Sequence, residues 1–388
     1  MENHNFINIS LPPTEDNHHK YKNALVSTIQ ELNNLNIRSA MNSGTDVLGK
    51  FYEVFLKYGN GAKEIGIVLT PRHITKWAVE ILDVTRHDYV YDPTCGTGGF
   101  LVAAFDHVRK LSTEMQLNNF KQFHLFGIEQ EPTVVALAIV NMIFRGDGKT
   151  NINEGNCFQK CLIKKVISGN VTASYSKNCG EKVITKVLMN PPFALKSGDE
   201  MEYKFVQNAL DQMDDGGLLF SVLPVSAMFE SGEEKRWRCN KLLKENTLLS
   251  VITFPNDLFY PIGVHTIGII VKKGIPHPNN QNVFWARVTH DGFIKSKSKR
   301  LPSSKEPNEL EFLLPNLKAF IQNPKFSIPD VPEFVKLSPI DYSDPLLELL
   351  PEAYLDSRPM LQPELEEGIE RLVRETAAMI IRYRREED

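Results

Sequence analysis

Apolar residues recur every three or four positions in two stretches near the N-terminus, which is the spacing of one helix face. The pattern predicts helices over 21–37 and 45–58, so residues 21–60 are interpreted as a short N-terminal helical segment. Residues 1–20 are polar and contain a Pro-Pro pair, and we expect them to form a mobile tail.

From about residue 70 the pattern changes to short apolar runs that alternate with amphipathic stretches. Thr70 is expected to be the N-cap of a helix whose first residue is Pro71. Strands that alternate with crossover helices predict an α/β fold with a largely parallel, doubly wound sheet. The predicted strands are 89–91, 124–128, 186–189, 218–223 and 249–254. The predicted helices after the first of these strands are 100–108, 133–144, 203–213 and 235–245.

Two later apolar runs, 267–272 and 283–288, are expected to form an antiparallel pair at the end of the sheet. The polar stretch 112–122 interrupts the alternation and is interpreted as an insertion. These elements place the main domain over residues 61–300.

Beyond residue 300 the chain is richer in proline and less periodic, so 301–388 is interpreted as a C-terminal extension. Its last part, 361–385, has an apolar stripe with Glu and Arg on the other faces, which predicts an amphipathic helical tail. Two interpretations stay open, because this helix could pack on its own domain or contact a partner protein.

Composition then narrows the class of protein. The 388 residues include 42% hydrophobic ones and carry 44 Lys+Arg against 48 Asp+Glu, a net charge of −4. This is ordinary globular usage, which excludes collagen-like and wholly disordered chains. The apolar runs are far shorter than the ~20 residues that span a bilayer, and the N-terminus lacks the pattern of a secretory signal.

The five cysteines are odd in number and irregularly spaced, which favours reduced thiols and a cytoplasmic location. Cys157 and Cys161 resemble half of a zinc site, but no CxxC or His pair completes it. We therefore predict no metal centre.

A glycine-rich stretch between a predicted strand and a predicted helix is the first candidate site. Doubly wound folds bind nucleotides here, at the carboxyl end of a strand, and glycines let the backbone approach a ligand closely. The stretch lacks the Lys-Ser/Thr of a P-loop and the G-x-G-x-x-G spacing of dinucleotide sites. The alternative is a turn that is glycine-rich for steric reasons alone. Its residues are Asp92, Pro93, Thr94, Cys95, Gly96, Thr97, Gly98, Gly99 and Phe100.

Glu129 stands at the end of the next predicted strand. In nucleoside-binding α/β folds a carboxylate at this place accepts hydrogen bonds from ribose hydroxyls. The alternative interpretation is a surface glutamate at a strand end.

The sequence Asn190-Pro191-Pro192-Phe193 ends another predicted strand. The two prolines fix the backbone and remove two N–H donors, so the carbonyl oxygens nearby and the Asn190 side chain are available as acceptors. Such acceptors can hold both hydrogens of a planar NH₂ group, and Phe193 offers a ring face for stacking. This arrangement suits transfer of an electrophile to a conjugated amino nitrogen, whereas the alternative is a rigid turn that caps the strand.

With these motifs, residues 45–300 resemble the adenine-N6 DNA methyltransferases, above all the modification subunits of Type I restriction-modification systems and their Type IIB relatives. The resemblance implies a class I S-adenosylmethionine-dependent methyltransferase sheet. It departs from the family pattern at Leu69, where an aromatic is common, and at Asn156, where an acidic residue is common. The matching segments are 70–72, 92–100, 127–129, 155–158, 190–193, 216–218, 259–266 and 291–293.

The resemblance also implies roles for individual residues. Residues 92–100 would cradle S-adenosylmethionine, Thr70 and Pro71 would lie near its methionine end, and Glu129 would hold its ribose. Asn156 and Cys157 would lie beside the adenine of the cofactor. Residues 190–193 would receive a flipped adenine of the DNA.

The implied function is site-specific methylation of adenine N6 in double-stranded DNA by direct transfer, without a covalent enzyme intermediate. The implied partners are a specificity subunit and, as a second candidate, a restriction subunit. Other planar amino targets stay open, namely cytosine N4, ribosomal RNA guanine and protein glutamine, as does a non-catalytic subunit on the same fold. The sixty-residue lead-in is too short for a nuclease domain, so we expect modification without cleavage.

Charge is unevenly distributed along the chain. Basic clusters occur at 235–238 and 293–300, whereas 306–311 and 364–370 are acidic. A net charge of −4 thus averages over a basic cleft and acidic outer segments, the alternative for each basic cluster being a solvated face. We expect weak DNA binding by this chain alone, with affinity and sequence choice supplied by a partner.

Overall fold

The computed structural model describes most of the chain between Leu69 and Asp356. The predicted tail and the predicted C-terminal helix lie outside the described residues, as does all of the N-terminal helical segment except Asn23, Val26, Ser27 and Gln30, which are helical. The described ranges are 69–143, 151–194, 198–260, 262–296, 299–328, 331 and 333–356, with those four residues.

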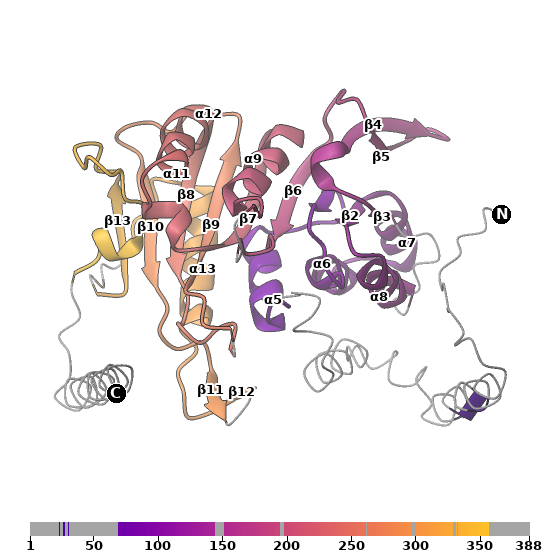
Figure 1. Cartoon of the computed structure of the whole chain (residues 1–388), viewed down its shortest axis with the longest axis horizontal. Coiled ribbons are helices and arrows are strands. Elements are labelled where there is room, and N and C mark those ends of the chain that lie inside the picture. Colours follow the sequence, from indigo (N-terminus) through magenta and orange to yellow (C-terminus); the bar gives the residue numbers. More distant parts are fainter. Residues whose placement is uncertain are drawn as a thin grey trace, which may run out of the picture.

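A nine-stranded sheet forms the centre of the described part of the chain, in the order β13-β10-β8-β9-β7-β6-β1-β2-β3 (Figure 1). Five neighbouring strands of this sheet run parallel, which confirms the predicted α/β fold with a doubly wound sheet. They are β1 (Val90–Asp92), β2 (Leu125–Glu129), β3 (Ile152–Glu154), β6 (Ile184–Met189) and β7 (Met213–Pro224).

The other half of the sheet is mixed. Strand β9 (Thr266–Lys273) lies between β7 and β8 (Asn246–Thr253) and is antiparallel to both. Strand β10 (Asn282–Arg287) is parallel to β8, and β13 (Val335–Pro339) completes this edge in antiparallel orientation. The predicted pairing of 267–272 with 283–288 is therefore wrong, because β8 separates the two strands.

Helices cover both faces of the sheet. Side chains of α5 (Arg72–Ile81), α6 (Gly99–Arg109) and α13 (Glu309–Gln322) belong to one buried cluster. Side chains of α9 (Glu202–Gln212) belong to a second buried cluster. Neighbouring residues of one strand alternate between the clusters, as with Leu219 and Phe220 of β7, which places the clusters on opposite faces.

Helix α8 (Pro132–Ile143) agrees with its prediction, whereas two other segments differ. The expected insertion over 112–122 is helix α7 (Glu114–Phe123), which begins with a capping box between Thr113 and Gln116. The helix expected over 235–245 is divided into short pieces, with a π-helical turn in the middle. These pieces are α11 (Glu233–Trp237), η2 (Arg238–Leu242) and α12 (Leu243–Glu245), which follow the short α10 (Ser226–Phe229).

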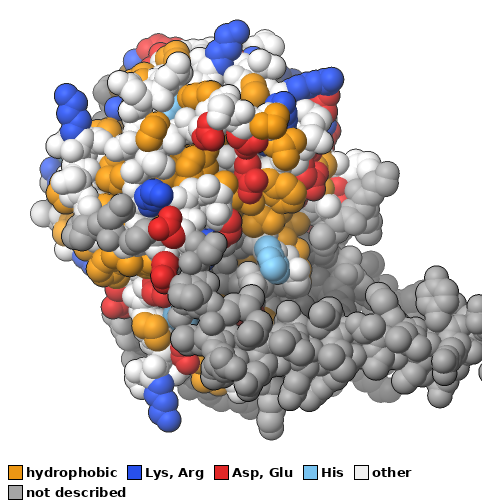
Figure 2. Space-filling model, turned by 90° about the vertical axis from the view of Figure 1, so that its left-hand side faces the viewer, with side chains coloured by type: hydrophobic (Ala, Val, Ile, Leu, Met, Phe, Trp, Pro, Cys, Tyr) orange, Lys and Arg blue, Asp and Glu red, His pale blue; other side chains and the backbone are white. Residues whose placement is uncertain are grey.

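The segment after residue 300 contributes to the same sheet. Helix α13 packs against α5 through a hydrogen bond from Trp77 Nε1 to the Leu310 oxygen, 2.8 Å long. Figure 2 shows the β13 end of the molecule, where Lys and Arg side chains are scattered singly among acidic and apolar ones. Two hairpins lie outside the nine-stranded sheet, namely β4 (Cys161–Ile167) with β5 (Asn170–Ser176) and β11 (Phe293–Ser296) with β12 (Lys299–Pro302). The 3-10 turn η3 (Pro351–Ala353) follows β13.

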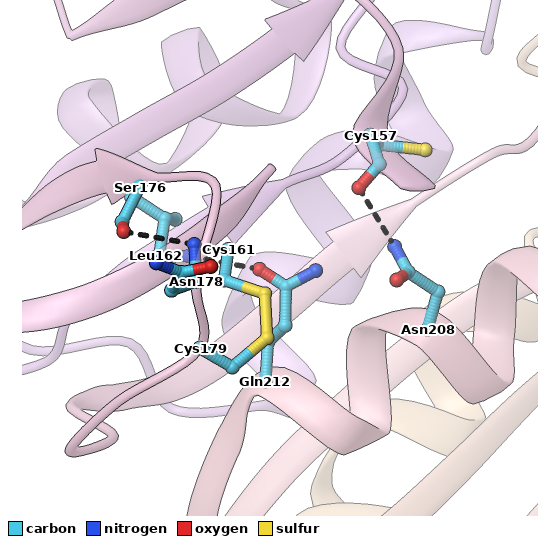
Figure 3. The surroundings of a disulfide bond; sticks show 8 residues. All are labelled: Cys157, Cys161, Leu162, Ser176, Asn178, Cys179, Asn208 and Gln212. Carbon is cyan, nitrogen blue, oxygen red and sulfur yellow. Dashed lines mark hydrogen bonds between the residues drawn. A yellow bond between two sulfur atoms is a disulfide. The ribbon is translucent and has the colours of Figure 1, made fainter. Parts of the chain in front are cut away.

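Cys161 forms a disulfide bond with Cys179, so the prediction that all five cysteines are reduced thiols is wrong for this pair. Hairpin β4–β5 causes the pairing, because it brings the two Cα atoms to 5.2 Å, a normal spacing for such a bond. Figure 3 shows Gln212 of α9 beside the disulfide, where its Oε1 accepts a hydrogen bond from the Leu162 N–H. Cys95, Cys157 and Cys239 are free.

No helix among the described residues is long and apolar enough to cross a membrane. Within the same part of the chain, His, Cys, Asp and Glu side chains nowhere gather in threes as a metal site would need.

Candidate active site

The glycine-rich stretch forms a tight turn between β1 and α6. The Cys95 N–H donates to the Ile128 oxygen at 2.8 Å, and the Gly98 N–H donates to the Cys95 oxygen at 2.7 Å. Gly96 and Gly98 have φ angles of 53° and 83°, which side-chain-bearing residues rarely adopt. Gly98 is also the N-cap of α6, so the turn leads directly into that helix.

The Glu129 carboxylate lies against this turn. Its Oε2 accepts a hydrogen bond from the Gly96 N–H at 3.0 Å, and its Oε1 accepts from Gln130 and Glu131 N–H groups at 2.7 and 2.9 Å. The structure therefore brings together two sequence motifs that are 33 residues apart. Three backbone donors fix the orientation of this carboxylate at the carboxyl end of β2.

Asp92 is the buried carboxylate of the turn, with only 1% of its surface exposed. One of its oxygens accepts a hydrogen bond from the Thr94 N–H at 3.1 Å. Burial, with the charge of Glu129 as a further cause, raises the pKa of Asp92 well above its usual range. A cationic group placed beside Asp92 would oppose this shift, because an opposite charge stabilises the carboxylate.

Cys95 packs against Gly127, the first residue of the Gly-Ile-Glu match. A Cβ atom at Gly127 would lie 2.9 Å from Cys95 Sγ and 2.8 Å from Leu101 Cδ1, so this position excludes a side chain. Burial raises the pKa of the Cys95 thiol well above its usual range. Cys95 is therefore a small packing residue and not a nucleophile.

Thr70 and Pro71 precede α5, but the prediction that Thr70 is the N-cap is wrong by one residue. Pro71 is the N-cap, and its oxygen accepts the first helical hydrogen bonds, from Ile74 and Thr75. The start of α5 lies beside the end of the glycine-rich turn, because a Cβ at Gly99 would be 3.8 Å from Thr75 Cγ2.

Asn156 and Cys157 lie close to Glu129. The Gly155 N–H donates to the backbone oxygen of Glu129 at 2.9 Å, which joins the end of β3 to the end of β2. Asn156 Oδ1 accepts from the Phe158 N–H at 2.8 Å and caps the short helix η1 (Cys157–Gln159). Burial raises the pKa of Cys157 to about 12.

Asn190, Pro191, Pro192 and Phe193 follow β6, which is the direct neighbour of β1. They therefore lie at the same edge of the sheet as the glycine-rich turn, since the carboxyl ends of parallel strands share one edge. Pro191 is buried and Pro192 is exposed. The Phe193 ring is 7% exposed and packs edge-on against Phe259, with ring centroids 5.5 Å apart.

A family model for N-6 DNA methylases matches residues 43–327. The chain belongs to this family. It is 36% identical over 262 residues to the Type II restriction enzyme and methyltransferase RM.BcgI of Heyndrickxia coagulans, a match that covers 66% of this chain and 39% of that protein. It is 27% identical over 313 residues to the Type I restriction enzyme EcoEI methylase subunit of Escherichia coli, covering 76% of this chain and 59% of that subunit.

Among solved structures, the Type I restriction enzyme EcoKI M protein has a TM-score of 0.52 at 21% identity, over 69% of this chain and 56% of that protein. This likeness confirms the fold expected from the sequence. The chain spans about two fifths to three fifths of the length of the two curated relatives.

Two further buried polar residues make hydrogen bonds to segments of the candidate site, although neither was identified from the sequence. Asn141 of α8 is 4% exposed and donates from Nδ2 to the Thr97 oxygen at 2.8 Å. Glu202 at the start of α9 is also 4% exposed, and its Oε1 accepts from the Ala194 N–H at 2.6 Å. A polar residue on the buried face of an apolar helix was the available signal for Asn141.

Two of the three arginines in the basic clusters are held inside the protein. Arg238 is fully buried and donates to four backbone oxygens, those of Ala227, Glu230, Leu346 and Leu347. Arg300 is paired with Asp291 and Asp257, whereas Arg236 is exposed and pairs with Glu233. Arg238 and Arg300 are therefore engaged by other parts of the chain, and the basic cleft stays a prediction.

Proposed function

We propose that this chain transfers the methyl group of S-adenosylmethionine to N6 of adenine in double-stranded DNA, as the modification component of a restriction-modification system. One observation carries the proposal: the glycine-rich turn with Glu129 and the Asn190–Phe193 segment lie on adjacent parallel strands, at one edge of the sheet. A cofactor site and an acceptor site at the ends of neighbouring strands suit direct transfer between two bound groups.

The cofactor side is proposed from the turn itself. Among the described residues, no atom lies within 4 Å of the place where Gly96 would carry a Cβ, so the backbone there is open to a ligand next to the Glu129 carboxylate. Glu129 would accept from ribose hydroxyls, and Thr70, Pro71, Asn156 and Cys157 would border the two ends of the cofactor. When bound, S-adenosylmethionine supplies an electrophilic methyl group and a positive charge, and the neighbouring Asp92 favours a cation.

The acceptor side is proposed from the Asn190–Phe193 segment. The prolines contribute no N–H donors, so the backbone oxygens and the Asn190 side chain can accept both hydrogens of an adenine amino group. Acceptors held in place stabilise the charge that develops on this nitrogen during transfer. The target base must leave the duplex to reach the segment, because its amino group is otherwise paired.

The partners are proposed from the relatives. Because one of them is named as the methylase subunit of a Type I restriction enzyme, we propose that a specificity subunit supplies sequence recognition, with a restriction subunit in the same assembly. Arg238 and Arg300 are engaged by other groups of the protein, which supports the proposal that this chain alone binds DNA weakly. We place the protein in the cytoplasm, where its DNA substrate lies.

The test is transfer of a labelled methyl group from S-adenosylmethionine to unmethylated phage DNA, with and without the product of the neighbouring gene. Nucleoside mass spectrometry should find N6-methyladenine, and Asn190→Ala should abolish the product while keeping cofactor affinity. Exposed Asn178→Ala is the matched control and should behave as wild type. Label in N4-methylcytosine, or no label in DNA under either condition, would refute the proposal.

A further inference from the structure

Two segments that are far apart in the chain meet at one buried carboxylate, Asp291, to which the proposed function assigns no role. Its side chain is fully buried just before hairpin β11–β12. Arg300 of β12 donates from Nη1 and Nη2 to the two Asp291 oxygens, at 2.7 Å each. His73 Nε2 lies 2.9 Å from Asp291 Oδ2. Such a bidentate pair fixes geometry as well as charge.

The cluster of His73, Asp291 and Arg300 is connected by contacts to the proposed base site. Arg300 Nη2 lies 3.2 Å from Asp257 Oδ1, and Lys295 Nζ lies 4.4 Å from the centre of the Tyr260 ring. Asp257 and Tyr260 flank Phe259 in one turn, and Phe259 is the ring against which Phe193 packs. Hairpin β11–β12 thus contacts this turn on both sides of Phe259.

The same cluster is also connected to the proposed cofactor site. His73 lies in the first turn of α5, two residues after Pro71, and its ring stacks on Phe293 with centroids 4.2 Å apart. In Figure 1 the hairpin extends beyond the lower edge of the sheet, near the lower end of α5. The start of α5 also borders Gly99 of the glycine-rich turn, through Thr75.

The electrostatics keep Asp291 ionised. Burial by itself would raise the pKa of Asp291, but the hydrogen bonds and charges of His73 and Arg300 outweigh it and bring the pKa to about 2. Replacing the carboxylate would leave the Arg300 guanidinium, which is 9% exposed, with only the more exposed Asp257 as counter-charge.

We propose that Asp291 is a positioning residue for methyl transfer. It couples the start of α5 to the turn that carries Phe259, and so sets the distance between the methyl donor and the wall of the base site. The inference rests on the proposed function. Asp291 touches neither proposed ligand site, so its loss should change the rate of transfer and not the affinity for cofactor. A displacement of about 1 Å at a reacting centre can cost on the order of a hundredfold in rate.

The experiment compares Asp291→Asn with Asp83→Asn in the full chain. Asp83 is the matched control, because it pairs with Lys318 at 2.7 Å just beyond the opposite end of α5. Since Asp291→Asn could also impair folding, His73→Ala is the second variant and His73→Gln its conservative rescue, as Gln keeps a nitrogen donor toward Asp291. Each protein is measured by hydrogen exchange over 69–75 and 255–260, by calorimetry with S-adenosylmethionine, and by single-turnover methylation of phage DNA.

For Asp291→Asn we expect faster exchange in both segments, a cofactor Kd within about threefold of wild type, and a transfer rate lowered at least about tenfold. His73→Ala should behave likewise, while His73→Gln and Asp83→Asn should stay near wild type. A wild-type transfer rate in Asp291→Asn and His73→Ala, or unchanged exchange over 255–260, overturns the inference alone. No methyl transfer by the wild-type protein, with or without its partner, refutes the proposed function and this inference with it.

Discussion

At the scale of single residues, a substitution at Gly96 allows two effects to be measured separately, the strain of a positive φ angle and the loss of space for a ligand. Gly96→Leu should lower the affinity for S-adenosylmethionine at least about tenfold, because a side chain would fill the open space beside Glu129. Gly169 is the matched control, since it also has a positive φ, 81°, and open space around its Cβ direction. Gly96→Leu and Gly169→Leu should have a similar backbone strain, of about 1–2 kcal/mol. Calorimetry should therefore show a loss of cofactor affinity for Gly96→Leu only.

Glu202 holds the backbone directly after Phe193, through the Ala194 N–H. Glu202→Ala should lower the methyl transfer rate about tenfold with little change in cofactor affinity, because the acceptor segment loses its anchor. Glu202→Gln keeps an acceptor oxygen and should restore most of the rate. Glu200→Ala is the control, as Glu200 is exposed and pairs with Lys204 in the first turn of α9. Equal rates for Glu202→Ala and wild type would contradict the assignment.

The candidate site residues that we predicted from the sequence are those whose signal is local. Asp92–Phe100 and Asn190–Phe193 each combine backbone-restricting residues within a few positions, so their conformations could be argued without knowing the fold. Asn141 and Glu202 belong to no such motif, because their partners Thr97 and Ala194 become visible only once the chain is folded. For Asn141 the apolar surroundings on its helix were a signal, but they did not indicate the partner. Asn156 shows the same limit, since its amide oxygen turned out to cap η1.

At the scale of elements, apolar periodicity predicted where the strands lie in the sequence better than it predicted their order in the sheet. Strand β9 is apolar and almost entirely buried, which suits a central strand as well as an edge pair. The sequence therefore could not show that β9 inserts between β7 and β8. Helix α7 was missed although its capping box is a local signal, because only one of its side chains, Phe120, is buried.

Hairpin β4–β5 allows a test of the disulfide. Tyr175 Oη donates to the Gly127 and Asn151 oxygens at 2.8 and 2.7 Å, so side-chain hydrogen bonds dock the hairpin without the bond. Cys179→Ser should therefore leave methyl transfer unchanged. In non-reducing urea titrations it should lower the free energy of unfolding by about 3 kcal/mol, because the unfolded chain loses a cross-link. With dithiothreitol wild type and variant should coincide, and a variant still weaker there would show that Cys179 matters as a thiol.

At the scale of the whole molecule, the net charge of −4 says less about DNA binding than the fate of individual charges. Arg238 joins Leu346 and Leu347 to the pieces after α10, and Arg300 joins the hairpin β11–β12 to α5 through Asp291. These two arginines thus act as internal anchors. The sequence could not distinguish this from a DNA-facing cluster, because each anchor depends on carbonyls or carboxylates far along the chain.

Global stability should also depend on pH through His277, which is 6% exposed and lies in the segment between β9 and β10. Burial lowers its pKa from 6.5 to about 4. Between these values the unfolded chain binds more protons than the folded one, so the free energy of unfolding falls as pH drops from 6.5 toward 4. The full effect of this one group is about 3 kcal/mol. Urea titrations at pH 7 and pH 4.5 should show that His277→Phe loses less stability than wild type, and an equal loss in both proteins would exclude His277 as a source of the dependence.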